Sequence, residues 1–165
     1  MPNHCINEII ISGEKSSIEQ FWNKIKRFDE NGENEKGKIS IFRSFIPIPV
    51  EIENTKAFND SPNWYDWAIE NWGSKWGDYN SDLDLSGCSI FGMFNSAWSS
   101  CNVGIKKISS LFPDLCFEVD YHELGMMFIG RQVCKNGEDI EEWSREITKE
   151  DLIELGYEDD EEEVD

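Results

Sequence analysis

The stretch SGCSIFGMFNSAWSSCNVGIKKISSLFPDLCFEVDYHELGMMFIGRQVC, residues 86–134, decides the fold. Its first part, residues 87–94, is rich in apolar side chains and predicts a central strand. From about residue 102 to residue 112 the apolar residues recur at helical spacing and predict an amphipathic helix. Residues 115–123 alternate apolar and polar side chains, and residues 126–134 return after a tight turn. The stretch therefore predicts a strand, a helix and two further strands.

The N-terminal part predicts a similar strand–helix–strand unit. Residues 5–12 are apolar and end at Gly13, as expected for a strand. Residues 16–27 predict a helix whose apolar side chains recur at positions i, i+3, i+4 and i+7, namely Ile18, Phe21, Trp22 and Ile25. In residues 38–45 the apolar side chains alternate with polar ones, which predicts a second strand.

Residues 46–85 contain several Trp residues and many turn formers, with a short helix expected over residues 63–71. We interpret this Trp-rich segment as an insertion between two core strands. Without it, the order of elements is the βαββαβ arrangement of a ferredoxin-like sandwich. The predicted fold class is α+β, with an antiparallel sheet, two helices on one face, an extra C-terminal strand and a short C-terminal helix.

The chain of 165 residues fits one compact domain with a tail. Residues 1–137 are expected to form the ferredoxin-like domain. Residues 138–157 are expected to form a short helical extension, in which Thr148 caps the helix. Residues 158–165, EDDEEEVD, predict a disordered acidic tail, because like charges repel one another and no apolar group anchors them.

The formal net charge of −19 is concentrated at the C-terminal end. Residues 138–165 contain 15 acidic and two basic residues, a net charge of −13, which leaves −6 for residues 1–137. Phosphate backbones are bound by surfaces rich in Lys and Arg, so direct binding to nucleic acid is not expected. A dense acidic surface instead suits a host protein with a basic surface.

The five cysteines lie at wide spacings without a C-x-x-C motif: Cys5, Cys88, Cys101, Cys116 and Cys134. This pattern argues against a zinc site or a disulfide framework and predicts reduced, mostly buried thiols in a cytoplasmic protein. No signal peptide and no run of about 20 apolar residues is evident, so no membrane association is expected. The sequence predicts no cofactor.

Several local strings are similar to those of a known family and follow one another in the same order. They are N-x-C-x-N from Asn3 with Gly13 after it, Pro47-Ile48-Pro49, NWGSKW at 71–76, FNSAWS at 94–99 and GMMFIG at 125–130. Together they resemble the YubB ferredoxin-like domain family of plasmid- and phage-borne proteins over about residues 1–137. The resemblance implies a ferredoxin-like fold and an origin in a mobile element. It transfers no catalytic residue, and the acidic tail lies outside it.

Two loops that approach the central strand supply the candidate binding residues. The residues are Trp72, Lys75 and Trp76 in the first loop and Asn95, Ser96 and Trp98 in the second. Together they could form an aromatic, partly basic pocket that stacks a planar ligand or a side chain of a partner. The alternative is that the Trp residues only anchor the inserted segment to the sheet.

Glu118, Asp120 and His122 share one face of a predicted strand. Carboxylates and an imidazole at alternate positions are weak candidates for a metal site or for acid–base chemistry in a hydrolase. The alternative is an ordinary solvated strand face that pairs with Arg131 or Lys135 on the next strand.

The sequence therefore predicts a non-enzymatic binding module, encoded by a phage, a plasmid or an integrated element, whose partner is a host protein. An alternative is an acidic inhibitor whose tail imitates the phosphate backbone and occupies the basic groove of a host nuclease or defence protein. The tail could equally be a solubilising extension.

Overall fold

A computed structural model describes residues 3–25 and 39–157 of the chain. They form a six-stranded antiparallel sheet in the order β2-β3-β1-β4-β5-β6. The strands are β1 (His4–Ser12), β2 (Tyr79–Ser86), β3 (Ser89–Ala97), β4 (Cys116–Glu123), β5 (Phe128–Lys135) and β6 (Glu138–Glu146). The predicted α+β class with an antiparallel sheet is confirmed.

The first four strands have the neighbour relations of a ferredoxin-like sheet, because β1 lies between β3 and β4 while β2 pairs with β3. The register of the central pair sets Ile10 opposite Phe91, and Ile10 lies opposite Glu118 on the other side. The predicted extra strand is β5, and β6 adds one more strand beyond it.

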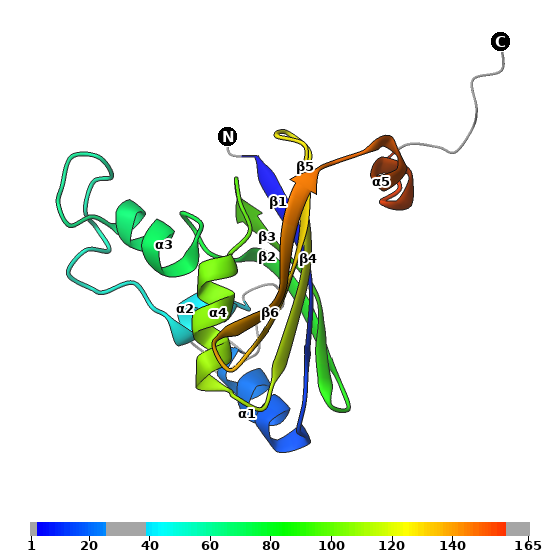
Figure 1. Cartoon of the computed structure of the whole chain (residues 1–165). Helices are drawn as coiled ribbons and strands as arrows, with labels where there is room; N and C mark the ends of the chain where they lie inside the picture. The colour runs from blue at the N-terminus through cyan, green and yellow to red at the C-terminus, as the bar shows by residue number, and fades with distance from the viewer. Residues whose placement is uncertain (1–2, 26–38, 158–165) are drawn as a thin grey trace, which may run out of the picture.

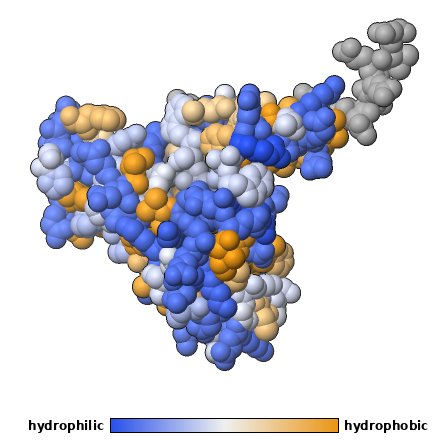
Figure 2. All heavy atoms as spheres, viewed as in Figure 1, coloured by the Kyte–Doolittle hydropathy of each residue, from blue (hydrophilic) through white to orange (hydrophobic). Residues whose placement is uncertain are grey.

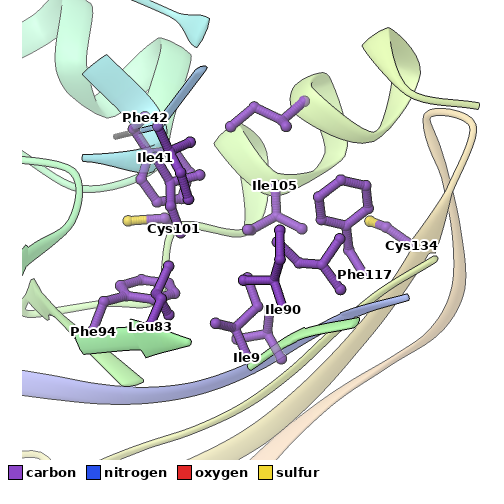
Figure 3. Packing of buried hydrophobic residues seen from close by; sticks show 14 of the residues in the cluster. Ile9, Ile41, Phe42, Leu83, Ile90, Phe94, Cys101, Ile105, Phe117 and Cys134 are labelled. Atoms are coloured by element: carbon purple, nitrogen blue, oxygen red, sulfur yellow. The ribbon is translucent and has the colours of Figure 1, made fainter. Parts of the chain in front are cut away.

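Four helices lie on one side of the sheet, α1 (Lys15–Ile25), α2 (Ile41–Phe45), α3 (Trp64–Trp72) and α4 (Asn102–Leu111), with α3 packed against α4 (Figure 1). The two helices of the βαββαβ unit are α1 and α4, as predicted. Alternate residues of β1, such as Ile9 and Ile11, are buried beneath them, whereas Ile10 is 46% exposed on the opposite face. Figure 3 shows Ile105 of α4 directed toward Ile9 and Ile90 of the sheet.

The predicted strand at residues 38–45 is wrong, because residues 41–45 form the helix α2; residue 38 lies outside the described residues. The Asp78 carboxylate accepts the N–H groups of Ile41 and Phe42 at 2.9 and 3.0 Å. Ser40 caps the same end through its side chain, which accepts the N–H of Arg43. These bonds satisfy donors that a helix start leaves open.

The second strand of the fold is β2, which the sequence analysis had placed within the insertion at 46–85. Ser81 and Leu83 face the core, whereas Asp82 and Asp84 are exposed. A tight turn joins β2 to β3. The inserted segment therefore lies between α1 and β2. The interpretation that it separates the second and third strands of the fold is wrong, because β2 and β3 form a hairpin.

Residues 138–146 form the exposed edge strand β6, where the helical extension 138–157 was expected. The helix α5 spans only Lys149–Glu154, and Thr148 caps it in a capping box with Asp151, as the sequence predicted. The division into domains stays a prediction, and the predicted tail at 158–165 lies outside the described residues.

The visible surface is mostly hydrophilic, with separate apolar patches (Figure 2). Within residues 3–25 and 39–157, no helix combines the length and the apolar character needed to span a bilayer.

Candidate functional site

The structure brings the two candidate loops together at one end of the sheet. Ser74 Oγ accepts the N–H of Ala97 and donates to the carbonyl oxygen of Ala97, at 3.1 Å in both cases. Ser99 Oγ donates to the carbonyl oxygen of Gly73 at 2.7 Å. Residues 72–76 are thus fixed against residues 95–99 by three hydrogen bonds.

Two of the candidate residues are buried and act as anchors. Trp72, the last residue of α3, is fully buried, and its indole N–H donates to the carbonyl oxygen of Ile46 at 2.9 Å. Ser96 is also fully buried; its hydroxyl accepts from the Asn7 amide at 3.0 Å and donates to the Ser99 carbonyl at 2.6 Å. For these two residues the anchor alternative fits the geometry.

Asn95 and Ser96 were expected in a strand-to-helix loop, but β3 continues to Ala97. Asn95 pairs with Ile6 of β1 and with Tyr79 of β2. The side chain of Asn95 therefore lies on the face of the sheet that α1–α4 leave open.

Of the remaining candidates, Lys75 and Trp76 belong to a partly exposed row of side chains, and Trp98 is exposed directly after the end of β3. Lys75 Nζ lies 4.1 Å from the centre of the Trp76 ring, and the Trp76 ring packs edge-on against Tyr79 at 5.9 Å. The Tyr79 hydroxyl lies 2.6 Å from His4 Nδ1. Trp98 is 44% exposed, and its backbone N–H donates to the Asn3 carbonyl at 2.9 Å.

We call these five residues, His4, Lys75, Trp76, Tyr79 and Trp98, the aromatic end. Tyr79 and His4 were missed by sequence analysis, because their place in the row depends on the register of β2 and β1. Burial raises the pKa of the Tyr79 hydroxyl, so the hydroxyl stays protonated; it lies 3.4 Å from the Ser96 carbonyl oxygen, to which it can donate.

A wide groove of about 560 Å³ lies next to the aromatic end. Its wall includes Ile6 and both histidines of the chain, His4 and His122, with Tyr157 from the C-terminal segment. His122 Nε2 lies 2.9 Å from the Tyr157 hydroxyl, and burial lowers the pKa of the imidazole. The contact between His122 and Tyr157 joins β4 to the segment that follows α5.

The weak metal candidates are arranged differently from a metal site. The Arg131 guanidinium binds Glu118 at 2.9 Å, Asp120 at 2.7 Å and Glu141 at 3.1 Å. The cross-strand alternative is thus confirmed for Arg131, which lies directly opposite Asp120. His122 is only 8% exposed and is engaged by Tyr157. In the part of the chain that the structure describes, no three His, Cys, Asp or Glu side chains converge as metal ligands would.

All five cysteines are free thiols, and Cys5, Cys101 and Cys134 are buried. Burial raises the pKa of Cys5 and of Cys134 to about 12 and raises that of Cys101 as well. A protonated thiol is a poor nucleophile, so these three side chains have a packing role.

Comparison with known proteins agrees with this fold. Residues 71–164 match the family model described as the ferredoxin-like domain in Api92-like protein. Among solved structures, the chain is similar to the crystal structure of a protein api92 from Yersinia pseudotuberculosis, with a TM-score of 0.68 and 9% sequence identity. The similarity covers 90% of this chain and 99% of the other. No curated protein matches the sequence.

Proposed function

The chain belongs to the family of ferredoxin-like domains in Api92-like proteins, and from this premise we propose that it is a non-enzymatic binding module. The aromatic end is its contact surface, and a host protein is its partner. The observation that carries the proposal is the partly exposed row from Lys75 through Trp76 and Tyr79 to His4, which is held on a buried framework.

The buried residues beneath the row support this role, because they hold its side chains in place in the unbound protein. Trp72 and Ser96 are buried beneath the loops, and Ser74 ties the loops together. Rigid aromatic side chains lose little conformational freedom on binding, and Trp, Tyr and Arg dominate the binding energy of most protein interfaces. A planar group or a side chain of the partner would stack on Trp76 or Trp98.

The absence of enzymatic activity is part of the proposal. Its support is that Glu118 and Asp120 are held in ion pairs with Arg131 and that the three buried thiols are kept protonated. Such groups are unsuited to act as a general base or as a nucleophile.

We also propose that the gene lies on a mobile element and that the protein acts in the cytoplasm. The first proposal rests on the similarity of the short Trp-containing strings to the YubB family. The second rests on the five free cysteines, which suit a reducing compartment.

The test is capture of a partner from a bacterial host lysate by the full chain and by two variants. Trp76→Ala should reduce the captured partner by about tenfold, because it removes the centre of the row. Phe58→Ala is the matched control, since it removes an exposed ring, 82% accessible, from the inserted segment. A partner retained equally by Trp76→Ala would contradict the assignment of the surface.

A second candidate function is inhibition of a host nuclease or defence protein by imitation of nucleic acid. The observation in its favour is the net charge of −13 that residues 138–165 carry. Deletion of residues 158–165 should then abolish the inhibition, as should salt well above the physiological level. Trp76→Ala should leave such an inhibitor active, which separates the two functions.

A further inference from the structure

One face of the sheet is not covered by α1–α4 and carries a compact group of apolar side chains. Ile10 of β1 and Phe91 and Met93 of β3 are 46%, 42% and 44% exposed. Ile10 and Phe91 are directly opposite each other in the register, and Met93 is two residues further along the same face. We call these three residues the apolar strip.

The strand register places acidic residues on both sides of this strip. Two rows of side chains cross β2, β3, β1 and β4 on the open face; they are Asp84–Phe91–Ile10–Glu118 and Asp82–Met93–Glu8–Asp120. Both outer positions of each row are therefore carboxylates. Alternation along each strand is what sets them on the same face as the strip.

The acidic rows keep a large negative charge after the ion pairs are counted. Arg131 is shared among Glu118, Asp120 and Glu141, so three carboxylates surround one guanidinium. Within the described ranges, Glu8, Asp82 and Asp84 form no ion pair, and the basic group that acts on Glu8 is the imidazole of His122. Exposed carboxylates on both sides of an apolar strip are the complement of a surface with cations on both sides of an apolar ridge.

The residues that follow α5 lie on the same face of the sheet, near one end of this strip. Leu155, which follows α5, shares a small cavity of about 70 Å³ with Glu8, Ile129 and Trp143 on the same face. Tyr157 contacts His122 of β4 in the same region. Leu155 and Tyr157 thus lie at the His122 end of β4, whereas the strip over β1 and β3 and the Asp120 carboxylate beside it stay exposed.

We propose that the apolar strip and its acidic flanks bind a basic amphipathic helix of a partner protein. The outer strands β2 and β4 are three strand spacings apart, roughly 14 Å, and a helix with its side chains is about 10–12 Å wide. An apolar stripe would rest on Ile10, Phe91 and Met93. Lys or Arg side chains on both flanks would extend over the helix edge to the carboxylates.

Nucleic acid is a poor occupant of the same surface, because phosphates would meet the carboxylates. The inference goes beyond the function proposed above, since it concerns another surface, and it can succeed or fail independently of the aromatic end.

The test uses the full chain and synthetic peptides of about 14 residues, long enough to cover the strip as a helix. The first peptide has a Leu stripe flanked by Lys and Arg. The second has the same stripe flanked by Glu, and the third has the composition of the first in scrambled order. Fluorescence anisotropy gives the affinities, and circular dichroism reports the helix that the first peptide forms on binding.

The protein variants are Asp82→Asn with Asp84→Asn, and Glu51→Gln with Glu53→Gln as the matched control; all four side chains are exposed. Wild type and control should bind the basic peptide with affinities within about twofold, and Asp82→Asn with Asp84→Asn should bind at least about tenfold more weakly. Trp76→Ala should bind like wild type.

Four results would overturn the proposal. They are no binding of the basic peptide, equal binding of the acidic or scrambled peptide, unchanged binding by the variant without Asp82 and Asp84, and loss of binding in Trp76→Ala. The last result would place the peptide on the aromatic end.

Discussion

Ser74 and Ala97 exchange two hydrogen bonds, since one serine hydroxyl serves both the N–H and the carbonyl oxygen of Ala97 at 3.1 Å. Both residues are buried. The Ser74 side chain bonds the two backbone groups of Ala97 that a neighbouring strand would otherwise bond. These two hydrogen bonds fix the loop after α3 to the end of β3. The position of Lys75 and Trp76 over the end of the sheet depends on this link.

Ser74→Ala should lower the free energy of unfolding by about 1–3 kcal/mol, because it leaves two buried backbone groups of Ala97 without a partner. Urea denaturation followed by Trp fluorescence measures the loss. Ser89→Ala is the control, since Ser89 bonds to Ser86 in an exposed turn and should change stability by about 0.5 kcal/mol or less. Equal free energies of unfolding for wild type and Ser74→Ala would show that these two hydrogen bonds do not stabilise the fold.

Trp72→Ala and Trp76→Ala should behave differently, although both residues belong to the same sequence string. Trp72 is fully buried, so its removal opens a cavity and should cost about 3–5 kcal/mol of stability. Trp76 is partly exposed, and its removal should cost about 1 kcal/mol. Thermal unfolding of the two variants side by side is the measurement, and similar losses would contradict the distinction between anchor and contact residue.

Gly92→Ala should prevent normal pairing of β2 with β3. A Cβ atom at Gly92 would lie 2.0 Å from the carbonyl oxygen of Asp82, and the residue has a φ of +152°. We expect a loss of about 4 kcal/mol or more. Gly87→Ala is the matched control: its φ is +59°, nothing lies within 4 Å of the added atom, and the expected cost is about 1–2 kcal/mol. Thermal unfolding of both variants, followed by circular dichroism, measures the two losses of stability. Equal melting temperatures would show that a Cβ atom at residue 92 does not clash with β2.

The stability should also depend on the ionisation of His122. Burial lowers the pKa of this imidazole in the folded state, with the Glu8 carboxylate acting in the opposite direction. The folded protein therefore resists protonation more than the unfolded chain, whose His pKa is about 6.5. Stability is complete above that value and falls as the pH drops through the folded-state pKa.

Urea denaturation at several pH values between about 7.5 and 5.5 tests this expectation. His122→Gln should flatten the decline in this range. Tyr157→Phe is the control, because it keeps a ring against His122 and should keep the decline. A decline of the same size in His122→Gln would assign the pH dependence to other groups.

Much of the fold can be predicted from period-2 and helical patterns in the sequence. Ile9 and Ile11 face the core and Ile10 faces outward, as alternation requires, and the helix after residue 101 has the expected apolar face in Ile105 and Ile108. Local patterns are sufficient here, because each of these elements buries a face of its own.

The errors arise where a distant residue decides the local structure. Residues 41–45 become a helix because Asp78 accepts its first N–H groups, and no local pattern shows that carboxylate. Strand β2 is hard to recognise because three of its eight residues are Asn or Asp. In the candidate site, Trp72 was predicted as a contact residue, but the indole ring fills the core beneath the loop.

The central place of β1 in the sheet has a consequence for synthesis of the protein. The run Ile9-Ile10-Ile11 is translated before both of its partner strands, since residue 10 pairs with residues 91 and 118. The nascent chain therefore carries an apolar, strand-forming segment without its partners until most of the polypeptide has left the ribosome. Chaperone contacts during translation would be concentrated on this apolar run.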